Sequence, residues 1–464
     1  MRLSESLNLS NGFNAIPLEE LICPEGFSCS CGKNHAAGIR ILKLGPGVIG
    51  QLPDILQILG ARRPMVVCGP YGYEAAGKAV CDLLEQSGVE YSLRSLREED
   101  GERIKPSEYA AGSLLLRFDH RCDLILGVGS GVINDLCKVL SKTAKLPYLI
   151  VATAPSMDGY TSDSASVEVG GIKRSLQEKK PDAILCDTQI LSQAPLHMIL
   201  AGLGDILAKY TALFDWKLSH IVTGEYYCEA VAKLFENSLE RTLDNLETFQ
   251  TDRERTVRSI TEGLIRSGIG IAFAGCTHPA SGLEHYFSHC WEMMLLERGK
   301  DYELHGIQVG IGLLLTLKII DYLKTLQPNM AHAEAAADCF DRNAWEQNLR
   351  RVFPKAADGI LEIEQKAHKN DREARLQRAA TAIEHWAEII SLADTLPSYE
   401  EAEAIMRQTG MPTDPLQIGL TAEDVTDAFI CSRDIRNKYL LSSLIWDLGY
   451  MDEAAAMLSG TFRE

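Results

Sequence analysis

The glycine-rich stretch Gly127-Val-Gly-Ser-Gly-Val-Ile-Asn-Asp135 is the strongest indication of fold in this sequence. It follows the apolar run Leu124-Ile-Leu126 and leads into the amphipathic segment Leu136-Cys-Lys-Val-Leu140. A strand that passes through closely spaced glycines into a helix presents bare backbone amides and the positive helix end at one point, which suits a pyrophosphate. Glycine also serves any tight strand-to-helix turn, so the stretch alone predicts the turn more firmly than its ligand.

Short apolar runs alternate with amphipathic segments between residues 38 and 195, which predicts an α/β, Rossmann-like domain with a mostly parallel sheet. The apolar runs are Ile39–Leu44, Met65–Cys68, Tyr91–Leu93, Leu124–Leu126, Tyr148–Val151 and Ala183–Cys186. After Pro195 the periodicity is helical up to Glu464. We therefore expect an arm over residues 1–37, the α/β domain over 38–195, and an all-α domain over 196–464.

Length and charge narrow the class of protein. A chain of 464 residues is long enough for two domains, and its formal charge of −18 disfavours binding to nucleic acid or to anionic membranes. No basic, apolar leader is visible at the start, and no window approaches the ~18 apolar residues that span a bilayer. We expect a cytoplasmic protein without a membrane span. Most of the 13 cysteines lie singly in apolar surroundings, so no disulfide framework is indicated.

The polar N-terminal arm holds four soft metal ligands, Cys23, Cys29, Cys31 and His35. They suffice for a tetrahedral metal, but their spacing fits none of the common zinc patterns. A surface arm with incidental thiols is the alternative.

A second candidate segment follows the apolar run Tyr148–Val151. The loop Ala152-Thr-Ala-Pro-Ser-Met-Asp-Gly-Tyr-Thr-Ser162 carries several hydroxyls and one acid. Ligands of such sheets bind at the carboxyl ends of the strands, where this loop begins. A turn capped by its own Ser and Thr side chains would look the same in sequence.

The helical region contains two further patterns. Asp205 and Lys209 are four residues apart on a predicted helix over 196–220, which suits either a surface ion pair or a buried acid with a function. His285 and His289 are one helical turn apart, and His305 follows after the break at Arg298-Gly299. Three such histidines give the geometry of a catalytic metal site with an open position.

These motifs, taken in this order, resemble glycerol-1-phosphate dehydrogenases, the bacterial AraM-type members above all, within the superfamily of iron-type alcohol dehydrogenases and dehydroquinate synthases. The resemblance covers about residues 38–320. It implies a dehydroquinate synthase-like, metal-binding helical domain, one divalent metal (Zn, Ni or Fe), and NAD or NADP as cofactor. It also implies a homo-oligomer, a homodimer by expectation, and a place in phospholipid biosynthesis.

Carried over by position, the resemblance gives each motif a role. Asp158 and His289 would act in catalysis and contact the substrate, and Asp205, His285 and His305 would hold the metal, with Asp205 also near the substrate. Lys209 is the basic residue best placed to bind a substrate phosphate, unless it only pairs with Asp205. The residues expected to bind the dinucleotide are Gly129, Gly131, Val132, Ile133, Asn134, Asp135, Thr153, Ala154, Pro155, Ser156 and Ser162.

The expected reaction is the interconversion of glycerone phosphate and sn-glycerol 1-phosphate, or of a closely related small phosphorylated ketose and polyol. After the second predicted strand the chain has Cys68-Gly-Pro70, where an acid often binds the adenosine ribose, so we expect both NADH and NADPH to be accepted. Arg62 and Arg63 lie nearby and could tolerate a 2′-phosphate. Two alternatives stay open: an NAD- and metal-dependent cyclase or lyase of the dehydroquinate synthase kind, and a non-catalytic metabolite sensor.

Overall fold

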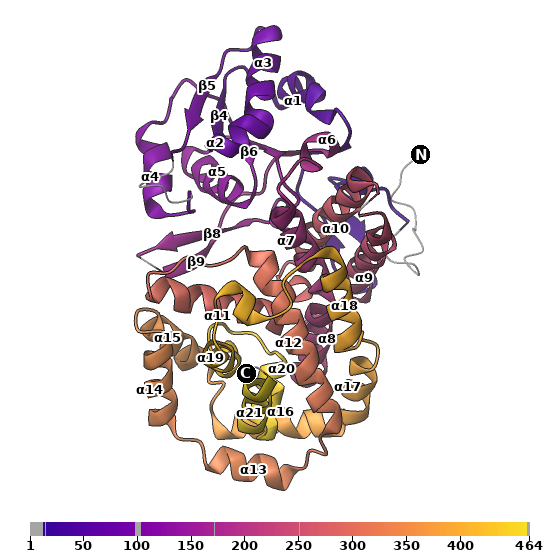
Figure 1. Cartoon of the computed structure of the whole chain (residues 1–464), viewed down its shortest axis with the longest axis vertical. Helices are drawn as coiled ribbons and strands as arrows, with labels where there is room; N and C mark the ends of the chain where they lie inside the picture. Colours follow the sequence, from indigo (N-terminus) through magenta and orange to yellow (C-terminus); the bar gives the residue numbers. More distant parts are fainter. Residues whose placement is uncertain (1–12, 14, 98–103, 171, 250, 462–464) are drawn as a thin grey trace. The chain divides into compact units, whose positions relative to one another are not determined.

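The computed structural model describes residues 13, 15–97, 104–170, 172–249 and 251–461 (Figure 1). The chain forms two compact units. Unit 1 comprises the described residues up to Ile206 together with Cys228–Cys276, and unit 2 comprises Leu207–Tyr227 and Thr277 onward.

The centre of unit 1 is a six-stranded sheet in the order β3-β10-β7-β6-β4-β5, and every pair of neighbours is parallel. The predicted parallel sheet is thus confirmed. Strands β4, β6, β7 and β10 are buried along their whole length, which explains why they appear in the sequence as continuous apolar runs. The strands are β3 (Ile41–Gly45), β4 (Pro64–Cys68), β5 (Ser92–Ser95), β6 (Leu124–Gly129), β7 (Tyr148–Ala152) and β10 (Ala183–Asp187).

Helices and two hairpins complete the α/β part of unit 1. The core is formed where aliphatic residues of α1 and α3 pack on those of β4, β6, β7 and β10. The helices are α1 (Leu52–Leu59), α2 (Pro70–Gly72) followed by a π-helical turn (Tyr73–Gly77), α3 (Lys78–Gln86), α4 (Glu108–Leu116), α5 (Gly131–Ala144) and α6 (Thr188–Leu191). The antiparallel hairpins are β1 (Phe27–Ser28) with β2 (Asn34–His35), and β8 (Ser164–Val169) with β9 (Ile172–Gln177).

Three helices that follow Pro195 also belong to unit 1, so the division differs from the expected boundary near residue 195. They are most of α7 (Leu196–Leu207), α9 (Glu229–Asp244) and α10 (Arg253–Ala274). Helix α10 contacts α9, α6, β2 and β3. Helical periodicity identifies an apolar face but not the surface that it packs against, which is why the sequence could not assign these helices.

Unit 2 is helical throughout its described residues, as expected for the C-terminal half. Its helix α11 packs against α12, α19 and α8. The helices are α8 (Lys209–Thr223), α11 (Leu283–Glu297), α12 (His305–Thr325), α13 (Met330–Asp338), α14 (Arg342–Val352), α15 (Ala357–Ala367), α16 (Arg372–Glu384), α17 (Trp386–Ala393), α18 (Tyr399–Thr409), α19 (Ala422–Ser432), α20 (Leu441–Leu448) and α21 (Met451–Thr461).

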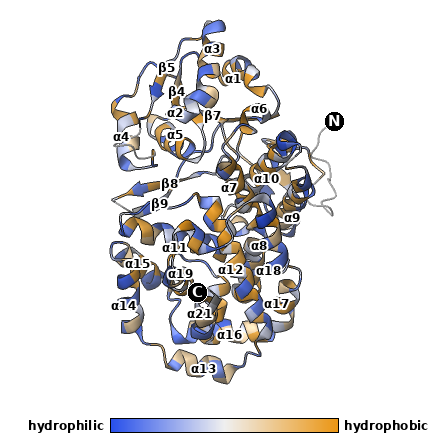
Figure 2. Cartoon of the chain, in the orientation of Figure 1, coloured by the Kyte–Doolittle hydropathy of each residue, from blue (hydrophilic) through white to orange (hydrophobic). Residues whose placement is uncertain are grey.

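Two helical stretches, Leu196–Thr223 and His305–Thr325, are long and apolar enough to cross a membrane by length and composition. The expectation that no window comes near this limit was therefore wrong. In the folded chain, however, 72% and 83% of their most apolar windows are buried. Figure 2 shows apolar and polar residues mixed along the helices of both units. Such burial is typical of core helices in a soluble protein.

Candidate active site

The glycine-rich turn joins β6 to α5 as predicted. Strand β6 ends at Gly129, Ser130 is the extended N-cap, and α5 begins at Gly131. No side chain caps this helix end and its first turn holds no acid. A Cβ on Gly129 would lie 2.6 Å from the Ile133 side chain, so only glycine fits there. Bare amides at the start of a 14-residue helix form a cradle that suits a pyrophosphate.

The loop after β7 begins at the same edge of the sheet. Gly129 and Ala152 are paired in register, and the Thr153 amide donates to the Gly129 carbonyl over 3.1 Å. The predicted residues Ala154, Pro155 and Ser156 are all buried. The Tyr160 hydroxyl donates to the Ala154 carbonyl over 2.7 Å. The loop is therefore a fixed part of unit 1, next to the glycine turn.

Two predicted cofactor residues use their side chains to hold this edge together. The Asn134 amide group donates to the Gly159 carbonyl (3.1 Å) and accepts from the Tyr148 hydroxyl (3.0 Å). The Asp135 carboxylate accepts from the Ser166 amide (3.1 Å). Asn134 is fully buried, so its side chain positions the loop.

Lys138 is a residue that the sequence did not single out. It is fully buried, and its ammonium donates to the Gly159 carbonyl (2.7 Å), the Ser162 hydroxyl (2.9 Å) and the Ser164 carbonyl (2.8 Å). Burial lowers the pKa of Lys138, while the charge of Asp135 opposes that shift. Lys138 thus holds the predicted cofactor residue Ser162. Lys138 follows Asn134 by one helical turn, so the two side chains lie on the same face of α5, and this spacing was a sequence signal for Lys138.

The structure brings Asp158 and Asp205 together within unit 1. The Asp158 amide donates to Asp205 Oδ2 over 2.9 Å, and the Ser267 hydroxyl of α10 donates to Asp158 Oδ2 over 2.7 Å. Asp205 is 1% exposed. A buried carboxylate is costly unless hydrogen bonds or a cation stabilise it. The burial of Asp205 therefore favours a functional site over the surface ion pair with Lys209 that the sequence also allowed. No motif or spacing in the sequence indicated a role for Ser267.

The three predicted histidines come together in unit 2. The ring centroids of His285 and His305 are 5.2 Å apart, and those of His289 and His305 are 5.6 Å apart. His285 Nδ1 lies 2.8 Å from a Glu284 carboxylate oxygen, and His305 Nδ1 lies 3.1 Å from the Ser288 hydroxyl. Because a carboxylate can only accept, Glu284 fixes His285 so that Nε2 is the metal-binding atom, and Ser288 orients the His305 ring.

Glu292 completes this cluster and was missed in the sequence. It is fully buried, one helical turn after His289, with carboxylate oxygens 3.6 Å from His289 Nδ1 and 3.6 Å from His305 Nδ1. His289, Glu292 and His305 offer ligand atoms that all lie within 4.8 Å of one another. Burial, with the charge of Arg436 as the next cause, lowers the pKa of His289 well below its usual range. The unprotonated form of His289 is therefore favoured.

Lys209 does not follow the predicted geometry. The helix expected over 196–220 is interrupted by a turn at Ala208, so Lys209 begins α8. It is 1% exposed, and its ammonium donates to the Ala280 carbonyl over 3.2 Å. This contact ties α8 to the turn His278–Ala280.

Arg62 and Arg63 lie at the wrong edge of the sheet for a 2′-phosphate. They precede β4, which begins at Pro64, whereas Cys68 ends that strand at the carboxyl edge shared with the glycine turn. Arg63 pairs instead with Glu90 and Asp119. The suggestion that these arginines assist NADPH was wrong.

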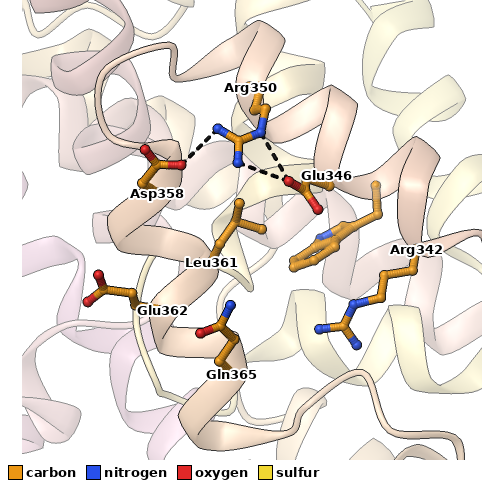
Figure 3. A pocket seen from close by; sticks show the side chains of 8 residues that line it. Arg342, Glu346, Arg350, Asp358, Leu361, Glu362 and Gln365 are labelled. Atoms are coloured by element: carbon orange, nitrogen blue, oxygen red, sulfur yellow. Dashed lines mark hydrogen bonds and ion pairs between the residues drawn. The ribbon is translucent and has the colours of Figure 1, made fainter.

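Figure 3 shows an open hollow between α14 and α15 in unit 2. Arg350 is already paired there with Glu346 (2.9 Å) and Asp358 (2.8 Å). The hollow has no histidine, cysteine or glycine turn in its lining, so it has none of the chemistry described above. Its lining residues are Arg342, Trp345, Glu346, Arg350, Asp358, Leu361, Glu362 and Gln365.

Known proteins share both the sequence and the fold. The profile of iron-containing alcohol dehydrogenases matches residues 43–195. A glycerol-1-phosphate dehydrogenase [NAD(P)+] of Halalkalibacterium halodurans is 35% identical over 288 residues, which cover 62% of this chain and 72% of that protein. The chain belongs to the glycerol-1-phosphate dehydrogenase family. It is an oxidoreductase, and the family resemblance in its sequence is confirmed.

Other members of the glycerol-1-phosphate dehydrogenase family align over still more of the chain. The enzyme of Geobacillus thermodenitrificans is 29% identical over 413 residues, covering 89% of this chain and 92% of its own. Among solved structures, a probable glycerol dehydrogenase of Sinorhizobium meliloti superimposes with a TM-score of 0.56 at 16% identity, covering 90% of this chain and 98% of that chain. At this low sequence identity, the structural similarity is evidence for the fold alone.

The side chains and amides present fit the two groups that such a dehydrogenase uses, a nicotinamide dinucleotide and a divalent metal. The amide cradle at Gly129–Ile133 suits the pyrophosphate, and it is the place that a Cβ would fill. Buried carboxylates and neutral imidazoles are ligands that Zn, Ni and Fe all accept.

Proposed function

We propose that the protein interconverts glycerone phosphate and sn-glycerol 1-phosphate, or a closely related small phosphorylated ketose and polyol, with NAD(H) or NADP(H). The names of its relatives support this substrate class. The observation that carries the proposal is the orientation of the candidate ligands, because the Asp158 amide holds Asp205, and neighbours at Nδ1 hold His285 and His305.

In this proposal Asp205, His285 and His305 hold one divalent metal, which supplies Lewis-acid polarisation of the substrate carbonyl when bound. One carboxylate oxygen of Asp205 accepts a hydrogen bond from the Asp158 amide, which fixes the orientation of this ligand. The Glu284 carboxylate can only accept at Nδ1, so it keeps His285 in the tautomer that presents Nε2, and the Ser288 hydroxyl orients the His305 ring. These contacts pre-organise each ligand within its own unit. The Glu292 carboxylate lies near both His289 and His305 and is a second group, beside the Ser288 hydroxyl, that orients His305.

The dinucleotide is proposed to lie along the carboxyl edge of the sheet. Amides of Gly131, Val132 and Ile133 would meet its pyrophosphate, and the loop Thr153–Ser156 would contact it from β7. Ser162 would take part through a hydroxyl that Lys138 already orients. Because this edge is built from buried, hydrogen-bonded groups, it can bind the cofactor without first being ordered.

His289 and Asp158 are proposed to act on the substrate. His289 would receive the hydroxyl proton of the polyol at Nε2, and the Glu292 carboxylate, which faces Nδ1, would offset the cost that burial places on the protonated ring. Asp158 is aligned by Ser267 and can accept a hydrogen bond from a substrate hydroxyl. Lys209 is buried on the Ala280 carbonyl, which favours positioning of the turn at residues 278–280 over direct contact with the phosphate.

Chiral analysis of the product made from glycerone phosphate tests this function. Reduced-cofactor oxidation that depends on added metal and yields sn-glycerol 1-phosphate is expected. Formation of sn-glycerol 3-phosphate, or turnover only with an unphosphorylated polyol, would overturn the substrate assignment. Release of inorganic phosphate without net cofactor oxidation would indicate the cyclase or lyase alternative, and no turnover at all would indicate a sensor.

We also propose a cytoplasmic homo-oligomer, with the homodimer as its simplest form, that supplies a glycerol phosphate for phospholipid synthesis. The charge of −18 supports an aqueous compartment and no nucleic-acid partner. Light scattering coupled to size exclusion would measure the oligomeric state, and a monomer of 51.1 kDa would contradict it.

A further inference from the structure

Four soft ligands converge in unit 1, and none of them is assigned a role in the reaction. Cys29, Cys31 and His35 belong to the N-terminal hairpin, and Cys228 is the N-cap of α9. Their ligand atoms all lie within 4.8 Å of one another. Cys29 Sγ is 3.7 Å from Cys228 Sγ, and His35 Nε2 is 3.4 Å from Cys31 Sγ and 3.6 Å from Cys228 Sγ.

These three separations are close to the ligand-to-ligand distances of a tetrahedral zinc site. Zinc bonds of about 2.3 Å to sulfur and about 2.0 Å to nitrogen give tetrahedral edges of about 3.8 Å between two sulfurs and about 3.5 Å between sulfur and nitrogen. A disulfide would need its sulfurs about 2.05 Å apart. Thiol hydrogen bonds could explain one pair but would not gather three thiols around a single imidazole nitrogen.

The histidine is oriented as a ligand. His35 is 1% exposed, and its Nδ1 donates to the Phe273 carbonyl at the end of α10 over 2.7 Å, so Nε2 carries the lone pair that faces the sulfurs. The rings of Phe13 and Phe273 pack against the imidazole, each with its centroid 5.6 Å away. These contacts fix the orientation of the His35 ring, so its Nε2 is directed at one position among the sulfurs.

The hairpin is shaped to present its two cysteines. Phe27 pairs with His35 across β1 and β2, and the turn between them closes when the Cys29 amide donates to the Lys33 carbonyl over 3.1 Å. Gly32 adopts a φ of +85°, which favours glycine.

We propose that Cys29, Cys31, His35 and Cys228 hold a structural zinc ion that fastens the N-terminal hairpin to helices α9 and α10 of unit 1. This site corrects the ligand set suggested by the arm alone. Cys23 does not belong to it, because its thiol donates to the Glu25 carboxylate over 3.0 Å at the surface. Three thiolates and one imidazole form a closed site, so this zinc is separate from the metal proposed for the reaction.

Metal analysis of matched variants of the full-length chain tests the proposal. Cys228→Ser and Cys31→Ser should each lose one equivalent of zinc and melt at a lower temperature than the parent. Cys23→Ser is the matched control, because it removes a thiol of the same arm that lies outside the cluster, and it should keep both properties. Unchanged zinc content in Cys228→Ser would overturn the site.

Spectroscopy on a second background keeps the test independent of the reaction. In His305→Ala, which should lack the catalytic metal, X-ray absorption at the zinc edge should show three sulfurs at about 2.3 Å and one nitrogen at about 2.0 Å. Cobalt substitution should give the intense ligand-field bands of a tetrahedral thiolate centre. A spectrum with only nitrogen and oxygen ligands would refute the zinc site while leaving the proposed function untouched.

Discussion

Replacing Gly202 by Ala should dislodge the loop that is proposed to hold the cofactor. Gly202 lies in the middle of α7, and a Cβ placed there would be 1.7 Å from the Pro155 carbonyl oxygen. Ordinary contact begins at 3.4 Å, so the loop or the helix must move by the difference, 1.7 Å. The obstruction is backbone, so no side-chain rotation can relieve it.

Two opposing effects set the magnitude. Alanine is favoured over glycine inside a helix by about 1 kcal/mol, whereas overpacking of this kind costs about 3 kcal/mol at the upper end of its usual range. The net destabilisation should be about 2 kcal/mol. A displacement of more than 1 Å at a binding loop should also reduce kcat/KM by about 100-fold.

The matched control is Gly112→Ala in α4, where an added Cβ meets nothing within 4 Å. It should stabilise the protein by about 0.5–1 kcal/mol and leave activity unchanged. Urea unfolding measures the free energies, and steady-state kinetics with the reduced cofactor measures the activity. If Gly202→Ala is as stable and as active as Gly112→Ala, the close approach of α7 to the loop is refuted. A loss of stability with unchanged kcat/KM would show that this loop does not contribute to cofactor binding.

Four further predictions concern the site and its surroundings. Ser267→Ala should lower kcat/KM by about 10- to 100-fold, because it removes the hydrogen bond that aligns the Asp158 carboxylate, and a bond of this kind is worth about 1.5–3 kcal/mol; activity equal to the parent would contradict this. His305→Ala should lose the metal proposed for the reaction together with activity, whereas His289→Ala should keep that metal and lose turnover; a total metal content equal to the parent's in His305→Ala would exclude that ligand. NADH and NADPH should both be accepted, since no acid follows β4 in Cys68-Gly-Pro70; a preference for NADH by several orders of magnitude would mean that another acid contacts the ribose. Burial, with Glu284 as the next cause, raises the pKa of Asp215 to about 8, so the folded state keeps a proton that the unfolded chain releases near 3.8. Stability should therefore fall as pH rises between these values, by at most about 1.4 kcal/mol per pH unit, and Asp215→Asn should flatten the slope of unfolding free energy against pH.

Much of the fold follows from patterns that lie within a few residues of one another. The continuous apolar runs of β4, β6, β7 and β10 predicted buried parallel strands, and the glycines after β6 predicted the turn into α5. Such signals survive in sequence because strand pairing, helix initiation and glycine conformation depend on neighbouring residues. The same holds for His285 and His289, whose spacing on one helix already predicted that they share a face.

Tertiary structure alone decided which distant groups meet. Cys228 is separated from Cys29 by 199 positions, so no spacing within the arm could have shown it as the fourth soft ligand in place of Cys23. Likewise, the hydrogen bond from Ser267 to Asp158 and the assignment of α9 and α10 to unit 1 depend on which apolar faces pack together. A sequence states how apolar a helix face is, but many surfaces could bury that face equally well. Only the packed structure selects one, because the fit of side chains across the whole core determines it.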